Sequence, residues 1–94
     1  MENGEIARRF ASLSTPLIAD GILRVKAPFR IGPFGIRPVN GRPRVVGRAL
    51  PVRHFGSVDV FLEAFESAKR GDVLVIDNQG RTDEACIGDL TALE

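Results

Sequence analysis

The sequence predicts a small α/β domain, and three patterns within its 94 residues support this class. Residues 73–76 are a continuous apolar run between polar turn residues, which is typical of a strand buried on both faces. Apolar residues recur at helical spacing over residues 58–68, and residues 44–53 are β-branched and partly alternating, as in a strand. A chain of this length can build one core, so we expect a single domain over residues 1–94.

Two helices are expected in the N-terminal part of the chain. The apolar spacing over residues 5–13 indicates a short amphipathic helix. Ser14 or Thr15 then offers an N-cap hydroxyl, and Pro16 suits the first helical position because its missing N–H costs nothing there. A second helix therefore runs to about Arg24.

The middle of the chain is interrupted by proline and glycine. Five of the six prolines and four glycines lie in residues 27–51, which excludes a long helix there. A strand is expected at the end of this stretch, over residues 44–53. Ser57 can cap a third helix that runs to about Arg70, and Gly71 can end it as a left-handed cap.

Two further elements are expected after the strand at residues 73–76. A short strand is indicated at residues 85–87, and Gly88 and Asp89 then begin a new helical pattern. The chain stops at Glu94, less than two turns into that pattern, and so short a helix is marginal. We therefore expect the 94 residues to be the N-terminal part of a longer protein.

Composition indicates a soluble, cytoplasmic protein. Apolar residues make up 44% and charged residues 27% of the chain, which is the balance of a globular protein rather than a disordered one. No apolar run approaches the roughly 18 to 20 residues of a membrane helix, and the N-terminus is acidic where a secretory signal is basic. The single cysteine, Cys86, excludes an internal disulfide, and a buried structural thiol is favoured over a reactive one.

Charge is segregated along the chain although the net charge is only +1. No Asp or Glu lies between Asp20 and Asp59, and this stretch carries +8 while the remainder carries −7. Such a distribution can mark a surface for an acidic partner, nucleic acid or anionic substrates, or it can draw the two halves together within the fold or between subunits. Nucleic acid is disfavoured because there is no Trp or Tyr to stack on bases.

Few residues stand out as chemical groups. His54 is the one histidine, and a surface or capping role is favoured over general-base chemistry. Asp77 ends the apolar strand, where active sites of open α/β sheets gather, but an Asp before Asn-Gln-Gly more often forms a turn.

Gly88, Asp89 and Leu90 form the most interesting group. A Gly at a helix start lets a ligand approach the backbone, where the free N–H groups of the first turn attract a carboxylate. Asp89 can hold a divalent cation or its water, as a hard oxygen ligand does. Local features alone favour a plain N-cap for Asp89.

Four blocks, residues 13–20, 46–49, 71–77 and 85–90, together resemble the RraA-like family, named for the regulator of ribonuclease E activity A. The family also contains class II 4-hydroxy-4-methyl-2-oxoglutarate/4-carboxy-4-hydroxy-2-oxoadipate aldolases, which also decarboxylate oxaloacetate. The resemblance implies a β/α sandwich like the swivelling phosphohistidine domain, truncated here at its C-terminal side. It also implies a trimer with the active site near a subunit boundary.

The aldolase signature of that family is a Gly-Asp pair followed about twenty residues later by Arg-Asp. Gly88 and Asp89 match the first half, and the second half would lie beyond Glu94. The resemblance implies that the backbone N–H groups from Gly88 to Leu90 bind the substrate carboxylate. It also implies that Asp89 holds Mg²⁺ or Mn²⁺ through water, and that the missing Arg stabilises the enolate oxygen.

These observations lead to one main hypothesis of function and two others. The main one is a fragment of a divalent-metal-dependent class II aldolase or oxaloacetate decarboxylase acting on pyruvate-yielding oxo acids, inactive without its Arg-Asp segment. The second is a regulator that acts on a ribonuclease by protein contact, without catalysis. The third is a minimal α/β fragment made to study folding.

Overall fold

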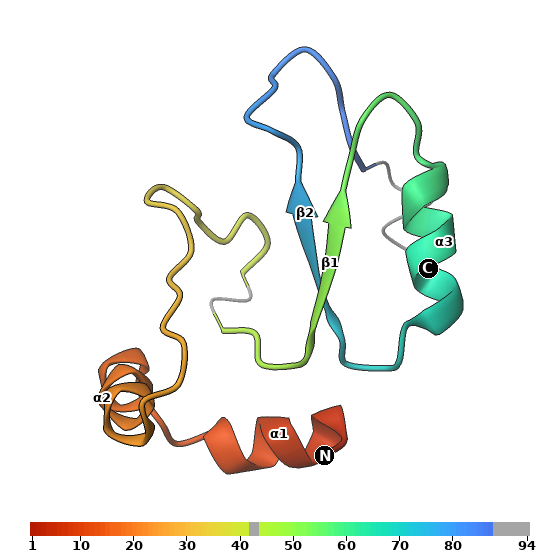
Figure 1. Cartoon of the computed structure of the whole chain (residues 1–94). Helices are drawn as coiled ribbons and strands as arrows, with labels where there is room; N and C mark the ends of the chain where they lie inside the picture. Colours follow the sequence, from red (N-terminus) through yellow and green to blue (C-terminus); the bar gives the residue numbers. More distant parts are fainter. Residues whose placement is uncertain (42–43, 88–94) are drawn as a thin grey trace. The chain divides into compact units, whose positions relative to one another are not determined.

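The computed structural model describes residues 1–41 and 44–87 (Figure 1). The chain divides into two compact units, Met1–Val46 and Gly47–Glu94. Helices and two parallel strands both occur, which is compatible with the predicted α/β class, whereas the single domain over residues 1–94 stays a prediction. Among the described residues, no helix combines the length and the apolar character needed to cross a membrane.

The first helix of the N-terminal unit is α1 (Asn3–Phe10), which begins earlier and ends earlier than the predicted 5–13. It ends at Phe10 because the chain then turns, with the Leu13 N–H donating to the Phe10 carbonyl at 3.1 Å. Arg44 supplies hydrogen-bond donors at the C-terminal end of α1. Its Nη2 donates to the carbonyl oxygens of Phe10 at 2.5 Å and Leu13 at 2.6 Å. Carbonyls at a helix C-terminus lack partners within the helix, so the contact with Arg44 stabilises it.

The second helix, α2 (Thr15–Val25), confirms the predicted signals. The Ser14 hydroxyl accepts a hydrogen bond from the Leu17 N–H at 3.3 Å, and a proline stands in the first turn. The helix ends at Val25 and is capped by Lys26, whose φ of 57° is left-handed, and the next N–H, of Ala27, donates back to the Ile22 carbonyl.

No helix or strand forms in the described residues between α2 and Ala49. The predicted strand over residues 44–53 is therefore too long by five residues, since β1 (Ala49–Arg53) covers only its second half. The reason is the partner strand, β2 (Val73–Asp77), whose first residue pairs with Ala49. Residues before Ala49 have no strand to pair with, and Val45 is 67% exposed.

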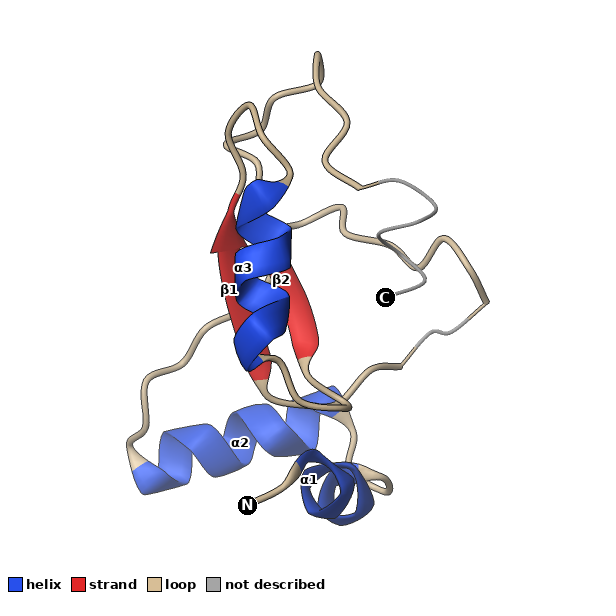
Figure 2. Ribbon diagram, turned by 90° about the vertical axis from the view of Figure 1, so that its right-hand side faces the viewer, coloured by secondary structure: helices blue, strands red, loops and turns tan. Residues whose placement is uncertain are grey.

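The C-terminal unit is a βαβ arrangement of β1, α3 (Asp59–Ser67) and β2. The two strands are parallel, in a register that runs from Ala49 opposite Val73 to Arg53 opposite Asp77. Figures 1 and 2 show α3 lying along one face of this two-stranded sheet. Parallel strands need such a crossover because a tight turn cannot join them.

The core of this unit lies between α3 and β1. Phe61 is 0%, His54 1% and Val52 5% exposed. Phe65, one of the apolar residues at helical spacing in the predicted helix over residues 58–68, is only half-buried. The prediction that β2 is buried on both faces is also wrong for this structure, because α3 covers one face only and Val75 is 51% exposed.

Both ends of α3 differ from the prediction in detail. Ser57 does accept a hydrogen bond from a backbone N–H, that of Asp59 at 3.1 Å, but Val58 occupies the cap position. The helix ends at Ser67 rather than near Arg70, because the Asp72 carboxylate accepts a hydrogen bond from the Lys69 N–H at 2.8 Å and holds a separate turn.

Two glycines meet where the strands of the C-terminal unit begin. A Cβ added at Gly47 would clash with the carbonyl oxygen of Gly71 and lie 3.1 Å from Cγ2 of Val73. Gly71 has a φ of 88°, which side chains disfavour, so it serves the turn before β2 rather than a helix cap. The Val73 N–H then donates to the Arg48 carbonyl at 2.8 Å.

The short strand predicted at residues 85–87 does not form in the structure. This segment has no strand beside it among the described residues, and isolated extended chain is not stable as a strand. Cys86 in this segment is half-buried, which is less than the buried structural thiol that the sequence favoured.

Candidate functional site

The polar residues of the C-terminal unit gather where both strands end. Because Arg53 pairs with Asp77, the chain leaves β1 at His54 and β2 at Asn78 on the same edge of the sheet. The His54 N–H donates to the Asp77 carbonyl at 2.9 Å, which continues the ladder by one bond. The carboxyl edge of a parallel sheet is where open α/β folds bind ligands, so these residues form the candidate site.

His54 is buried, which corrects the prediction of a surface or capping residue. Its ring stacks on Phe61 with centroids 5.4 Å apart and planes 23° from parallel. Side chains alternate between the two faces of a strand, and the chain continues straight from the buried Val52 to the buried His54. That two-residue spacing was the signal in the sequence, but it becomes decisive only once α3 is known to cover this face.

The hydrogen bonds of Asn78 show whether the Nδ1 atom of His54 donates or accepts. Arg81 can only donate, and its Nη2 lies 3.3 Å from Asn78 Oδ1, so that atom is the amide oxygen. Asn78 Nδ2 in turn donates to the Arg81 carbonyl at 3.0 Å. The His54 Nδ1 atom, 2.8 Å from the same oxygen, therefore carries the proton and donates it.

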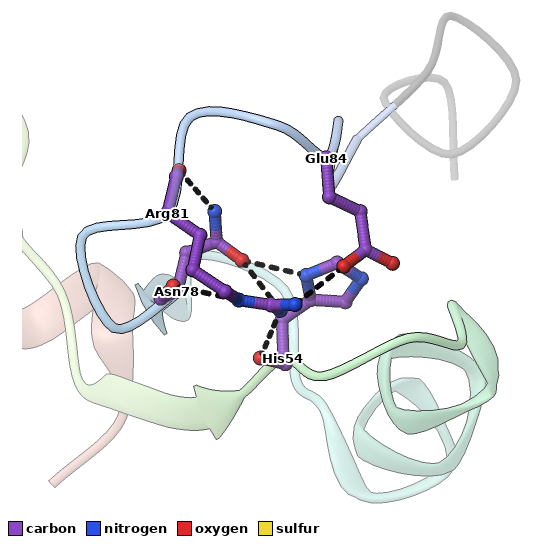
Figure 3. A network of polar contacts seen from close by, with 4 residues as sticks. All are labelled: His54, Asn78, Arg81 and Glu84. Carbon is purple, nitrogen blue, oxygen red and sulfur yellow. Dashed lines mark hydrogen bonds and ion pairs between the residues drawn. The ribbon is translucent and has the colours of Figure 1, made fainter.

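Arg81 is the centre of this network (Figure 3). Its Nη1 pairs with Glu84 Oε2 at 2.6 Å, and its Nη2 donates to the His54 carbonyl at 3.1 Å. The guanidinium carbon also lies 4.5 Å from the centroid of the Phe55 ring. No local sequence pattern indicates a role for Arg81, because its contacts with His54 and Phe55 join residues more than twenty positions apart.

Asp77 serves a turn, as the sequence indicated. Its Oδ1 accepts a hydrogen bond from the Gln79 N–H at 2.9 Å, and Gln79 and Gly80 both have positive φ, at 57° and 69°. Its Oδ2 lies 3.5 Å from Nε of Arg53. Both side chains of that ion pair are more than half exposed, so the pair adds little stability.

Gly88, Asp89 and Leu90, the predicted substrate and metal residues, lie outside the described residues. Within the described ranges, no three His, Cys, Asp or Glu side chains come close enough to hold a metal ion. The described residues therefore do not by themselves provide three such ligands for Mg²⁺ or Mn²⁺. The described part of the candidate site is the hydrogen-bonded network at the sheet edge.

Comparison with known proteins identifies the family. Searches of curated proteins and of solved structures found no match. A scan against protein-family models matches residues 15–94 to the RraA-like family, described as Aldolase/RraA. This match covers most of the chain, including both strands, the polar network and the Gly88-Asp89 pair. The chain therefore belongs to the RraA-like family.

Proposed function

We propose that this chain forms the carboxylate- and metal-binding half of a divalent-metal-dependent class II aldolase or oxaloacetate decarboxylase that acts on pyruvate-yielding oxo acids. The observation that carries the proposal is that the family match includes Gly88 and Asp89. In the sequence these two residues follow Glu84, a member of the polar network at the sheet edge, by four and five positions. Carboxylate ligands of α/β folds bind at such edges, next to free backbone N–H groups.

In this proposal the backbone N–H groups of Gly88, Asp89 and Leu90 bind the carboxylate of the oxo acid. Asp89 contributes to holding Mg²⁺ or Mn²⁺ through water, and the ion supplies positive charge near the developing enolate. Within the described ranges, no group of three His, Cys, Asp or Glu side chains could hold the ion without Asp89.

The finer features of assembly also belong to the proposal. The βαβ unit is compatible with the swivelling phosphohistidine-domain-like β/α sandwich that the family resemblance implies. A homotrimer with the active site at a subunit boundary would supply the missing ligands, and the protein would work in the cytoplasm. The apolar side chains of Phe34 and Val39 are 106% and 99% exposed, and burying them against a partner subunit would stabilise such a trimer.

Ligand binding by the 94-residue chain tests the proposal directly. Oxalate mimics the enolate of pyruvate, so a titration with Mg²⁺ present should shift the backbone amide resonances of residues 88–90. Asp89→Asn keeps a capping oxygen but loses the charge, so we expect a 10- to 100-fold loss of Mn²⁺ affinity, read from water-proton relaxation.

Asp83→Asn is the matched control, since Asp83 is an exposed carboxylate that precedes Asp89 by six residues in the sequence. It should leave Mn²⁺ affinity unchanged. Equal Mn²⁺ affinity of wild type and Asp89→Asn would mean that Asp89 is only a helix cap, and would contradict its proposed role in holding the metal.

Turnover provides a second test. The 94 residues contain no Arg-Asp dipeptide, and a donor that stabilises an oxyanion typically contributes a factor of about 10² to 10³ in rate. We therefore expect no oxaloacetate decarboxylation by this chain above the background of the metal alone. Turnover near that of a complete enzyme would place the site elsewhere.

The alternative is a regulator that binds a ribonuclease without catalysis, and the charge segregation is the observation that favours it. A stretch of sequence with +8 and no carboxylate would attract an acidic protein partner. This reading predicts no oxalate-dependent shifts at residues 88–90 and binding to the ribonuclease that weakens with salt.

A further inference from the structure

We infer that two surfaces of this chain bind each other between copies: an acidic face of α3 in one copy and a basic segment at the end of α2 in the next. The basic segment is residues 23–31. The acidic face consists of five exposed residues: Val58, Asp59, Leu62, Glu63 and Glu66. The contact goes beyond the proposed function and needs neither metal nor substrate; only its closure into a homotrimer rests on that proposal.

The acidic face lies on the side of α3 that points away from the sheet, which is the side seen in Figure 2. Asp59, Glu63 and Glu66 follow one another at helical spacing and are exposed. Val58 and Leu62 lie beside them, also one turn apart, and are 47% and 55% exposed. The outer side of α3 therefore presents a stripe of carboxylates next to an apolar stripe.

The charges of the acidic face are unfavourable within α3 itself. Like charges three or four positions apart repel each other, and Asp59, Glu63 and Glu66 stand at these spacings. A carboxylate near a helix C-terminus also opposes the helix dipole, and the last turn of α3 holds Glu66 but no basic residue. None of these carboxylates takes part in the three ion pairs that the described residues form. A basic partner would relieve both costs.

The basic segment has the complementary character. Arg24, Lys26 and Arg30 are exposed, and no carboxylate occurs anywhere in residues 21–58. These three cations are likewise absent from the ion pairs of the described residues. Four apolar side chains of the segment are between 41% and 78% exposed: Leu23, Val25, Phe29 and Ile31. Exposed apolar clusters of this kind, edged by polar groups, mark interaction surfaces.

The partner is a second copy, because the chain itself carries the surface of opposite charge. Three carboxylates beside apolar side chains can meet three cations beside apolar side chains, so one contact pairs charges and covers apolar area together. Anionic lipid would also attract the basic segment, but it would leave the acidic face of α3 without a partner. Pairing within one chain would satisfy the same charges, and mixing complementary variants distinguishes it from pairing between copies.

The contact is heterologous, because two different surfaces meet. Each copy uses its acidic face toward one neighbour and its basic segment toward the other. Such head-to-tail contacts close into a ring when the rotation between copies allows it. A ring of three copies is the homotrimer of the proposed function.

Charge reversal tests the acidic face. Glu63→Lys combined with Glu66→Lys places cations opposite cations, so self-association in sedimentation equilibrium should weaken about tenfold or more. Glu2→Lys combined with Asp83→Lys is the matched control, since both side chains are exposed outside the two surfaces and the net charge changes equally. The control should associate as the wild type does, and circular dichroism confirms that both variants fold.

Mixing tests the pairing itself. Arg24→Glu combined with Arg30→Glu reverses the basic segment and should weaken self-association to a similar extent. In a one-to-one mixture with the Glu63→Lys, Glu66→Lys variant, the unaltered acidic face of one variant meets the unaltered basic segment of the other, so association should return. Wild-type association should also weaken as salt rises from about 0.1 M to 1 M, which shortens the Debye length from about 10 Å to 3 Å.

The other outcomes overturn the inference. A wild type that stays monomeric at every concentration contradicts it, and so do reversal variants that associate as the wild type does. Variants that unfold more easily, in a mixture that stays unassociated, would mean that the two surfaces pair within one chain. Binding to anionic phospholipid vesicles without self-association would assign the basic segment to a lipid surface. A chain that associates as expected but binds no oxalate upholds this contact and counts against the proposed function.

Discussion

The two compact units of the chain bury their side chains to very different extents. Among the described residues of Met1–Val46, only Asn3 is buried, and α2 buries none of its residues. In the described part of Gly47–Glu94, Phe61, His54 and Val52 form a small core between α3 and β1. Hydrophobic stabilisation scales with buried apolar area, so the second unit should contribute most of the stability.

The two units also differ in what holds them. The N-terminal unit depends on helix-end contacts: Ser14 at the start of α2 and Arg44 at the end of α1. The C-terminal unit depends on contacts between residues far apart in sequence, such as Gly47 with Gly71 and Arg81 with His54. Matched substitutions in the two units therefore test the comparison.

The largest effect is expected at Phe61. Phe61→Ala empties a fully buried site, and truncating a buried aromatic costs about 3 to 5 kcal/mol. A urea titration followed by circular dichroism gives the free energy of unfolding. Phe34→Ala, at a wholly exposed position of the other unit, should change it by less than about 0.5 kcal/mol. Equal losses at the two positions would mean that the contrast in burial is absent in solution.

Glycine-to-alanine substitutions should have opposite signs in the two units. Gly47→Ala places a Cβ against the Gly71 backbone, and overpacking of this kind costs about 1 to 3 kcal/mol. Gly21→Ala, inside α2 with nothing within 4 Å of its added Cβ, should stabilise by about 0.5 to 1 kcal/mol. Thermal unfolding of both variants measures the difference, and a stabilising Gly47→Ala would contradict the close approach.

The smallest effect is expected at the cap of α2. Ser14→Ala removes the acceptor of the Leu17 N–H, which typically costs about 1 kcal/mol. The loss should appear as reduced helical circular dichroism, with little change in the exchange of strand amides. Ser12→Ala, before the cap, is the control; an equal loss there would remove the capping assignment.

The elements that the sequence predicted best are those with local signals. Ser14 and Pro16 mark the start of α2, and its end at Val25 is one residue from the predicted one. The apolar run of β2 is correct to within one residue at Asp77. By contrast, the end of α3 was wrong, because a side chain beyond the helix, Asp72, decides where the turn begins.

The candidate site was predicted only in part. Gly88 and Asp89 were chosen from the resemblance and stay predictions. His54 and Arg81 were missed because their roles depend on partners 24 and 27 residues away, which no local pattern indicates. The spacing of residues along a strand predicts which side chains lie on the same face. It does not predict which distant loop will contact that face.

The constant offset of 24 residues between paired positions of β1 and β2 has a consequence for the order of folding. No strand bond can form until a loop of that length has closed, and its entropic cost falls on the first contact. α1 and α2 need only bonds between near neighbours and can form within about a microsecond. The slow step of folding should therefore be the joining of residues 47–49 to residues 71–73, before α3 has its sheet to pack on.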